Sequence, residues 1–235
     1  MIKFTYKIIS KIYSKISTYL ENIFLLKKKI LIEEPLYRFK NLEINKVNFE
    51  KFEKIKHNKY LVKYIFPEEE ILSLVFDIFK KNDLASKITN LTGFNYTLSF
   101  FIAYKTFKLS KEDENYEWYA NDFHKDKPYS QNMIKVLLSY QEIGANDGPM
   151  IINYKKNYKV TIDPNEVVLF FPNKHFHKAS SPESGSRFQI MFQLIPSKDW
   201  QINNKIFSKQ RKIEPKFPFF SYFFDKKTNL KKLKL

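Results

Sequence analysis

The sequence predicts a mainly β fold with supporting α-helices. Helical patterns are confined to residues before 95, short strand-like segments follow from there onward, and turn signals separate these segments at short intervals. Many short strands after a helical start are typical of a β-sandwich or barrel with helices on one side. The chain of 235 residues is long enough for one well-buried domain with extensions.

Two longer helices are predicted near the N-terminus. In residues 2–32, lysine recurs every fourth position, and isoleucine, leucine and tyrosine fall roughly opposite, which indicates an amphipathic helix. The second helix runs from Glu68 to about Lys80. Pro67 and three glutamates suit its first turn, while two lysines suit its last turn. Gly93 is expected to end a further short helical segment.

Eight strands are expected in the second part of the chain. Turn-forming residues at 145–149, 163–165 and 182–185 separate several of them. The expected strands cover residues 96–108, 117–124, 132–142, 149–154, 158–162, 166–172, 175–180 and 186–195.

The basic charge lies at the two ends of the chain. Residues 1–66 carry 15 basic and 6 acidic side chains, and residues 201–235 carry 10 and 2, so the total of +16 leaves residues 67–200 close to neutral. We therefore expect a basic N-terminal region (1–66), a central domain (67–200) and a basic aromatic tail (201–235). Such ends attract phosphates, although a solvated lysine surface explains them equally well. No nucleic-acid motif is present, so no specific nucleic-acid partner is expected.

The sequence favours a cytoplasmic protein. It contains no cysteine, which excludes disulfides and thiolate metal sites and fits a reducing compartment. No uncharged apolar run reaches the ~20 residues of a spanning helix, and the N-terminus lacks a signal-peptide core. The helix in residues 1–32 is expected to pack its apolar face on its own domain. A peripheral contact with a membrane surface is the alternative.

A constellation of rare residue types indicates a metal site. His124 and Asp126 are two positions apart at an expected strand end, so their side chains point the same way. Two histidines and one carboxylate leave one side of a metal open, which suits non-haem Fe(II). The second histidine is His177 or His175, which share strand parity, and the spacing to Arg187 favours His177. His57 is expected at the surface.

The arginine that follows these histidines has a separate significance. Only three of the 41 basic residues are arginine, and Arg187 lies ten positions after His177. The turn at 182–185 would bring its strand back beside that of His177, and a guanidinium grips a carboxylate through two parallel hydrogen bonds. The structural alternative is a pair of core histidines with a salt-bridging arginine.

The stretch 116–196 resembles the phytanoyl-CoA dioxygenase-like branch of the iron- and 2-oxoglutarate-dependent oxygenases. The similar segments are residues 123–126, 134–140, 146–149, 168–171, 177–180 and 187–188, preceded by the helix at 68–80. The resemblance implies a double-stranded β-helix core, also called a jelly roll or cupin-like fold. It also implies that His124, Asp126 and His177 bind Fe(II), and that Arg187, with help from Ser180, binds the distal carboxylate of 2-oxoglutarate.

The same resemblance implies hydroxylation of a small-molecule substrate with O2, releasing succinate and CO2. The chain departs from the family after Pro149. Residues 150–159 pass directly into the next strand, whereas many members carry a longer loop that helps to roof the site. The substrate is therefore left open among a CoA thioester, a lipid-linked sugar, a nucleotide sugar and an uncharged metabolite. The alternatives are a non-catalytic jelly-roll binding module and a basic membrane-surface protein. The oligomeric state is not specified.

Overall fold

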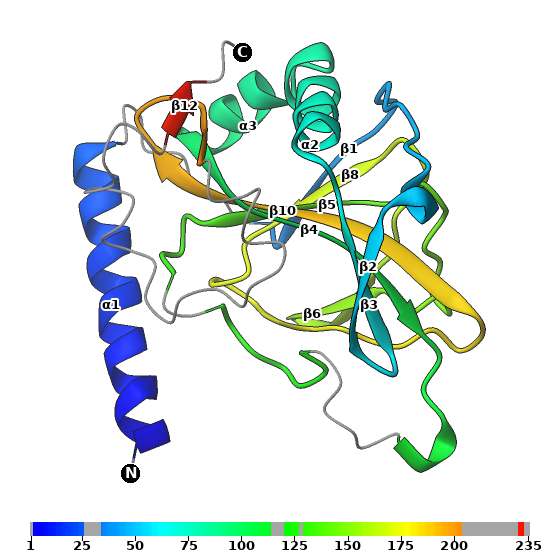
Figure 1. Cartoon of the computed structure of the whole chain (residues 1–235). Coiled ribbons are helices and arrows are strands. Elements are labelled where there is room, and N and C mark those ends of the chain that lie inside the picture. The colour runs from blue at the N-terminus through cyan, green and yellow to red at the C-terminus, as the bar shows by residue number, and fades with distance from the viewer. Residues whose placement is uncertain (1, 26–33, 114–119, 127–128, 204–229, 233–235) are drawn as a thin grey trace.

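Two long antiparallel strands, β4 (Asn95–Phe107) and β10 (Ser186–Ser197), run through the centre of the main sheet (Figure 1). The computed structural model describes residues 2–25, 34–113, 120–126, 129–203 and 230–232. Beyond β10 the sheet continues through β5 (Ile134–Leu138), β8 (Val167–Phe170) and β1 (Leu36–Phe39).

The outer edge of β4 pairs with different strands at its two ends. Its C-terminal half pairs with β3 (Leu61–Ile65), which in turn pairs with β2 (Glu53–Asn58). Its N-terminal half pairs in parallel with β11 (Gln201–Asn203), which is followed by β12 (Leu230–Lys232). The other pairings of this sheet are antiparallel.

A smaller antiparallel sheet packs against one face of the main sheet. It consists of β7 (Lys156–Val160), β6 (Met150–Tyr154) and β9 (Phe176–Lys178). Buried side chains of both sheets, such as Ile152 and Met191, form one hydrophobic core between them. The two facing sheets form a double-stranded β-helix, so the predicted mainly β fold with a jelly-roll core is confirmed.

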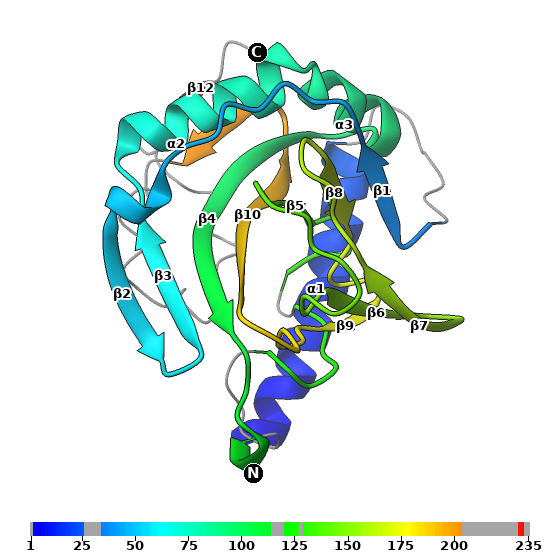
Figure 2. The same cartoon turned by 90° about the vertical axis from the view of Figure 1, so that its right-hand side faces the viewer.

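Helices cover the opposite face of the main sheet. These are α2 (Glu68–Val75), its continuation η2 (Phe76–Lys81, a π-helix) and α3 (Leu84–Thr92). Their apolar stripes, including Ile71, Ile78 and Leu84, share a second core with Phe188 and Phe192 of β10. Figures 1 and 2 show the resulting layers, with α2 and α3 above the main sheet and β6 below it. Two short 3-10 turns, η1 (Phe49–Lys51) and η3 (Lys111–Asp113), lie in connections.

Strand β4 contains a β-bulge at Ser99, which changes the face of the sheet towards which the following side chains point. Gln193 of β10 pairs with Phe100 and the next residue pairs with Leu98, which leaves Ser99 as the extra residue. Its hydroxyl donates to the carbonyl of Gln193 at 3.1 Å. Because a bulge reverses the alternation of a strand, Leu98 and Phe101 both face the helices despite their odd spacing.

The strands expected after residue 95 are present with shifted bounds, except for one. Residues 117–119 lie outside the described residues, and residues 120–123 form no strand. His124 makes only an isolated bridge. The prediction was wrong there because Asn121 and Asp122 favour turns over strands. Strands β1 to β3 were not predicted. They come from the expected N-terminal region and join the main sheet, while the domain boundaries at 66 and 200 stay predictions.

The N-terminal helix α1 (Ile2–Phe24) lies along one side of the sheets, behind them in Figure 2. The predicted helix extended to residue 32, but residues 26–33 lie outside the described ones. Backbone and side-chain bonds tie α1 to residues 131–132. The amide of Gln131 donates to the Thr18 hydroxyl at 2.9 Å, and the Asn132 amide donates to Glu21 at 3.2 Å. In the described part of the chain, no helix is long and apolar enough to cross a membrane.

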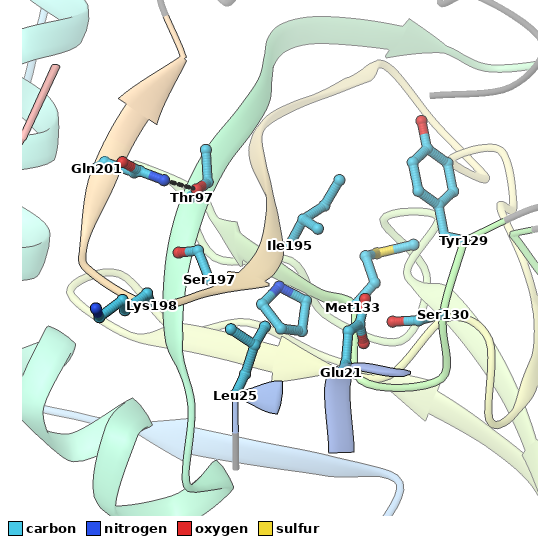
Figure 3. Close-up of a pocket in the computed structure, with 11 residues that line it drawn as sticks. Glu21, Leu25, Thr97, Tyr129, Ser130, Met133, Ile195, Ser197, Lys198 and Gln201 are labelled. Carbon is cyan, nitrogen blue, oxygen red and sulfur yellow. Dashed lines mark hydrogen bonds between the residues drawn. The ribbon is translucent and has the colours of Figure 1, made fainter. Parts of the chain in front are cut away.

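The last turns of α1 border a cavity of about 190 Å³ at one end of the main sheet (Figure 3). Glu21 and Leu25 lie on the helix side of this cavity, and Thr97, Met133 and Ile195 lie on the sheet side. Burial raises the pKa of the Glu21 carboxyl to about 8, because hydrogen bonds from Ser130 and Asn132 compensate only part of the lost hydration. Ionisation of Glu21 therefore opposes the docking of α1.

Glu21→Gln is expected to stabilise the protein selectively at alkaline pH. The pKa of Glu21 is higher in the folded state than in the unfolded state. The stability that neutral Glu21 provides is therefore fully present below about pH 4.5 and is lost as the pH rises towards 8. Glutamine does not ionise and keeps the bond from Asn132. We expect a Tm higher by about 5–10 °C at pH 8.5 and nearly equal Tm values at pH 4.5, measured by circular dichroism.

The exposed carboxyl of Glu183 provides the control, since Glu183→Gln is expected to leave the pH profile of the wild type unchanged. Parallel profiles for wild type and Glu21→Gln would contradict a raised pKa at this helix.

Candidate metal centre and adjoining cavity

Backbone pairing brings His124 and His177 together although 53 positions separate them. The amide of each residue donates to the carbonyl of the other, at 3.0 Å in both directions. His177 belongs to β9, whose pairing with β6 holds it in the smaller sheet. The amide of Asp126 donates to the carbonyl of Pro172 at 3.3 Å, which fixes the second potential ligand of that segment.

The side chains of His124, Asp126 and His177 converge. One ligand atom from each lies within 4.8 Å of the other two. The Oδ1 atom of Asp126 is 3.3 Å from Nε2 of His124 and 3.6 Å from Nε2 of His177. The side chains of His124 and Asp126 thus point the same way, as their i, i+2 spacing suggested, although the segment that carries them is irregular and not a strand. Two imidazoles and one carboxylate at these distances form the donor set of a facial triad.

The protonation of Asp126 and His177 suits a cation. Burial by itself would raise the pKa of Asp126, but Lys135 and the two histidines hold it well below its usual range, so the carboxyl is ionised. Burial lowers the pKa of His177 to about 4, so this ring is neutral at pH 7. Burial also lowers the pKa of His124, but the hydrogen bonds with the Asp126 carboxylate and the Asp122 carbonyl, together with the negative charge of Asp126, outweigh burial and the net shift is upward. Neutral imidazole and ionised carboxylate are the forms that bind metals.

His175 lies outside this cluster. It precedes β9, its ring contacts Tyr154 edge-on at 5.2 Å between centroids, and its carbonyl faces Nδ1 of His177 at 3.4 Å. The geometry therefore favours His177 over His175, as the spacing to Arg187 does in the sequence. His57 is exposed on β2, where the sequence placed it at the surface.

Arg187 shares a cavity of about 160 Å³ with the three potential ligands. The side chain is 3% exposed, and its guanidinium donates to the carbonyl of Gly148. Tyr104, with its ring centroid 6.0 Å from the guanidinium carbon, and Gln189 add polar atoms to the lining, while Leu137, Met150, Phe170 and Met191 make the rest largely apolar. The expectation that the turn at 182–185 brings the strand of Arg187 back beside that of His177 is wrong, because β10 pairs with β4 and β5 in the main sheet whereas β9 pairs with β6 in the smaller sheet. The side chains of Arg187 and His177 instead line the same cavity from the two sheets.

Ser180 does not line this cavity. Its hydroxyl donates to the carbonyl of Pro149. Ser180 and Arg187 therefore hold two successive carbonyls of the segment that precedes β6. The expected help of Ser180 in binding a carboxylate stays a prediction.

Lys135 is the residue at this site that the sequence did not indicate. It lies on β5, its side chain is 13% exposed, and its ammonium group forms an ion pair with the Oδ2 of Asp126. It was one of 38 lysines in the sequence, and only the pairing of β5 with β10 and β8 turns it inward. Together with Arg187 and Lys178 it gives the lining of the cavity three cations against one carboxylate, which favours an anionic ligand.

The cavity beside α1 lacks such a donor set. Glu21 is the one carboxyl in its lining, and no histidine borders it. Within the residues that the structure describes, the convergent donors therefore lie in the jelly-roll interior. Fold and site together define the chain as a jelly-roll protein with a candidate facial-triad metal centre and an adjoining basic cavity.

The chain is similar to known proteins in three-dimensional structure. No family model and no curated protein sequence matches the chain. HygX from Streptomyces hygroscopicus, solved with nickel, 2-oxoglutarate and hygromycin B bound, is 11% identical, with a TM-score of 0.49 over 71% of this chain and 84% of that one.

Two further solved structures are similar to a comparable extent. An oxidoreductase of the 2OG-Fe(II) oxygenase family from Burkholderia pseudomallei is 11% identical, with a TM-score of 0.47 over 65% of this chain and 76% of that one. The non-heme alpha ketoglutarate dependent epimerase SnoN from nogalamycin biosynthesis is 11% identical, with a TM-score of 0.46 over 61% and 66%. Identities and TM-scores at this level are too low to transfer a reaction or a substrate to this chain. None of these three is described as a phytanoyl-CoA dioxygenase.

His177→Ala is expected to abolish high-affinity binding of a divalent metal, whereas His175→Ala is expected to preserve it. Loss of a ligand should weaken binding by more than the roughly 100-fold that removal of an outer hydrogen-bond partner costs. Titration with Co(II), followed by its visible absorption, measures the effect. Equal affinity of the two variants would show that His177 is not a ligand.

Gly148 is expected to tolerate no side chain. Its φ is +73°, and a Cβ atom would lie 2.6 Å from backbone atoms of Ser181 and Pro182. Gly148→Ala should lower the free energy of unfolding by at least about 2 kcal/mol, since both strain and overlap oppose it. Gly185→Ala, at φ +59° with open space around it, shows the cost of strain alone. Similar denaturation midpoints for the two variants would contradict the close approach at Gly148.

Proposed function

We propose that this protein is an Fe(II)- and 2-oxoglutarate-dependent dioxygenase that hydroxylates a small-molecule substrate, including a lipid- or sugar-linked one. One observation carries the proposal. Two histidines and an ionised aspartate converge in the same cavity as a buried arginine, inside a jelly roll. The sequence motifs further favour the phytanoyl-CoA dioxygenase-like branch, and this narrower assignment rests on the motifs alone.

His124, Asp126 and His177 would hold the iron. Their donor chemistry is one carboxylate oxygen and two imidazole nitrogens, with the remaining side of the cluster towards the cavity. With iron, 2-oxoglutarate and O2 bound, the centre supplies oxidative chemistry in which 2-oxoglutarate becomes succinate and CO2 and the substrate gains a hydroxyl group. The protein supplies the ligands, the orientation and the exclusion of water.

Arg187 would bind the carboxylate of 2-oxoglutarate that lies farther from the metal. The guanidinium is buried at the edge of the cavity and donates a hydrogen bond to the Gly148 carbonyl. Its position is therefore fixed before a ligand binds. A charge-assisted pair in an apolar lining is stronger than one in water. Lys135 adds positive charge from β5, the strand next to β10 in the same sheet, and orients Asp126 through their ion pair.

The cavity size separates the co-substrate from the substrate. About 160 Å³ is below the roughly 300–1,000 Å³ of typical small-molecule pockets, so it suits a molecule of the size of 2-oxoglutarate. The substrate would then lie at the mouth, where His124 is one-third exposed and Lys178 borders the opening. Strands β6 and β7 are joined at Lys155 by a tight hairpin, so no long loop follows Pro149 here.

A role at a membrane is a separate proposal, because it depends on α1 and not on the metal centre. A cytoplasmic location, which the lack of cysteine favours, also stays a prediction.

The proposal predicts succinate formation from 2-oxoglutarate by anaerobically iron-loaded protein once O2 is admitted. His124→Ala should reduce this turnover to the background rate. Arg187→Lys keeps the charge but loses the two-pronged hydrogen bond, so it should raise the 2-oxoglutarate concentration needed for half-maximal rate by about 10–100-fold.

Arg38→Lys is the matched control, since Arg38 pairs with Glu166 away from the cavity. It should leave the dependence on 2-oxoglutarate unchanged. Absence of turnover together with absence of Fe(II) binding would reject the oxygenase and favour the non-catalytic binding module.

A further inference from the structure

Helix α1 is mounted with its polar side towards the protein and its apolar side towards solvent. Ser10, Ser14, Ser17 and Glu21 are at most 5% exposed. On the outer side, large apolar side chains are 45–65% exposed, namely Ile8, Ile9, Ile12, Ile16, Tyr19 and Ile23. With 3.6 residues per turn, these six positions fall within about a third of the helix circumference. This is the reverse of the orientation that the amphipathic sequence predicts for a helix packed on its own domain.

Specific contacts fix this rotation of the helix. The Thr18 hydroxyl accepts from the Gln131 amide, and the Asn132 side-chain amide donates to both Glu21 and Asn22, the latter at 2.9 Å. The serines that face inward are small, which permits close approach of the helix. Turning the apolar side inward would break these bonds and bury larger side chains in the same space. The contacts that hold α1 on the protein therefore keep the apolar stripe exposed.

A contiguous exposed apolar stripe of this kind marks a binding surface. Its flank identifies the chemistry of the partner. Lys11 and Lys15 are exposed at the edge of the stripe. Apolar side chains bordered by lysines on a non-spanning helix match the boundary of an anionic lipid bilayer, where acyl chains lie beneath negatively charged headgroups.

Charge also argues against a second copy of this chain as the occupant. The chain carries a net charge of +16, of which +9 lies in residues 1–66. Two such helices packed face to face would bring their lysine edges into the same interface, and like charges there would repel. The same lysines that would repel each other in a dimer attract an anionic surface.

We propose that the outer side of α1 docks the protein on an anionic lipid bilayer, with Ile8, Ile12, Ile16, Tyr19 and Ile23 entering the interface. The helix lies parallel to the membrane and does not cross it. This inference goes beyond the proposed oxygenase function and does not depend on it, because none of these residues borders the metal centre.

The test is sedimentation of the full-length protein with vesicles of phosphatidylcholine, with and without phosphatidylserine. Binding is expected with phosphatidylserine, weaker binding without it, and a decrease with rising salt. Ile12→Ser/Ile16→Ser should weaken binding at least roughly tenfold, since two buried apolar side chains are lost. Lys11→Glu/Lys15→Glu should also weaken binding roughly tenfold or more and should remove most of its salt dependence.

Phe76→Ser is the matched control, since Phe76 on η2 is 52% exposed and Ile12 is 53% exposed. This variant should bind vesicles like the wild type. All these positions are exposed, and an unchanged Tm confirms that each variant folds. Two results would overturn the proposal. One is the absence of wild-type binding to phosphatidylserine vesicles. The other is a wild-type dimer that Ile12→Ser/Ile16→Ser converts to monomers, which would make a second copy the occupant.

Discussion

The antiparallel pairing of β4 with β10 is the constraint on which the remaining structure depends. It runs from Ser186 opposite Phe107 to Ser197 opposite Asn95, and β5, β3 and β11 attach to these two strands. Because β10 alternates without interruption, one of its faces carries Phe188, Ile190 and Phe192 into the helix-covered core. Its other face carries Arg187, Gln189 and Met191 into the cavity. The same strand thus anchors the helices and lines the site.

The candidate centre has separate structural supports for the three potential metal ligands and for Arg187. The three potential ligands depend on the bridge between His124 and His177 and on the bond from Asp126 to Pro172. Arg187 depends on β10 and on the carbonyl of Gly148. The net positive lining provided by Lys135 and Arg187 lies in a largely apolar interior, where charges interact more strongly than in water. A dicarboxylate is therefore better matched to the cavity than a neutral molecule of the same size.

The sequence predicts the parts of this structure in which local pattern and residue type suffice. The spacing of His124 and Asp126, the apolar strand before His177 and the turn before Arg187 each carry local signals, and the mainly β architecture follows from the strands after residue 95. Lys135 could not be distinguished from the other lysines, because its inward position is set by pairing partners distant in the chain. Strands β1 to β3 lack strong alternation and acquire their structure from the sheet edges that they extend.

Helix α1 shows a different limit of sequence-based reasoning. Its amphipathic pattern is genuine, but the pattern does not specify which side faces the protein. That choice is made by the small serines and by Gln131 and Asn132, which meet the helix across more than a hundred positions of sequence. The hydrophobic side is therefore available to the surroundings, although a helix of the same pattern would ordinarily bury it.

The extra residue at Ser99 has a consequence for comparing this chain with others. Before Ser99 the even-numbered residues of β4 face the helix-covered core, and after it the odd-numbered residues do. Leu98 and Phe101 therefore face one core, while Ile102 and Tyr104 face the other. A homologous strand without the bulge would be aligned correctly along only one half of β4, and its inward and outward positions would be exchanged along the other half. Alignments of distant relatives should therefore admit a one-residue gap inside this strand, a place where gaps are ordinarily penalised.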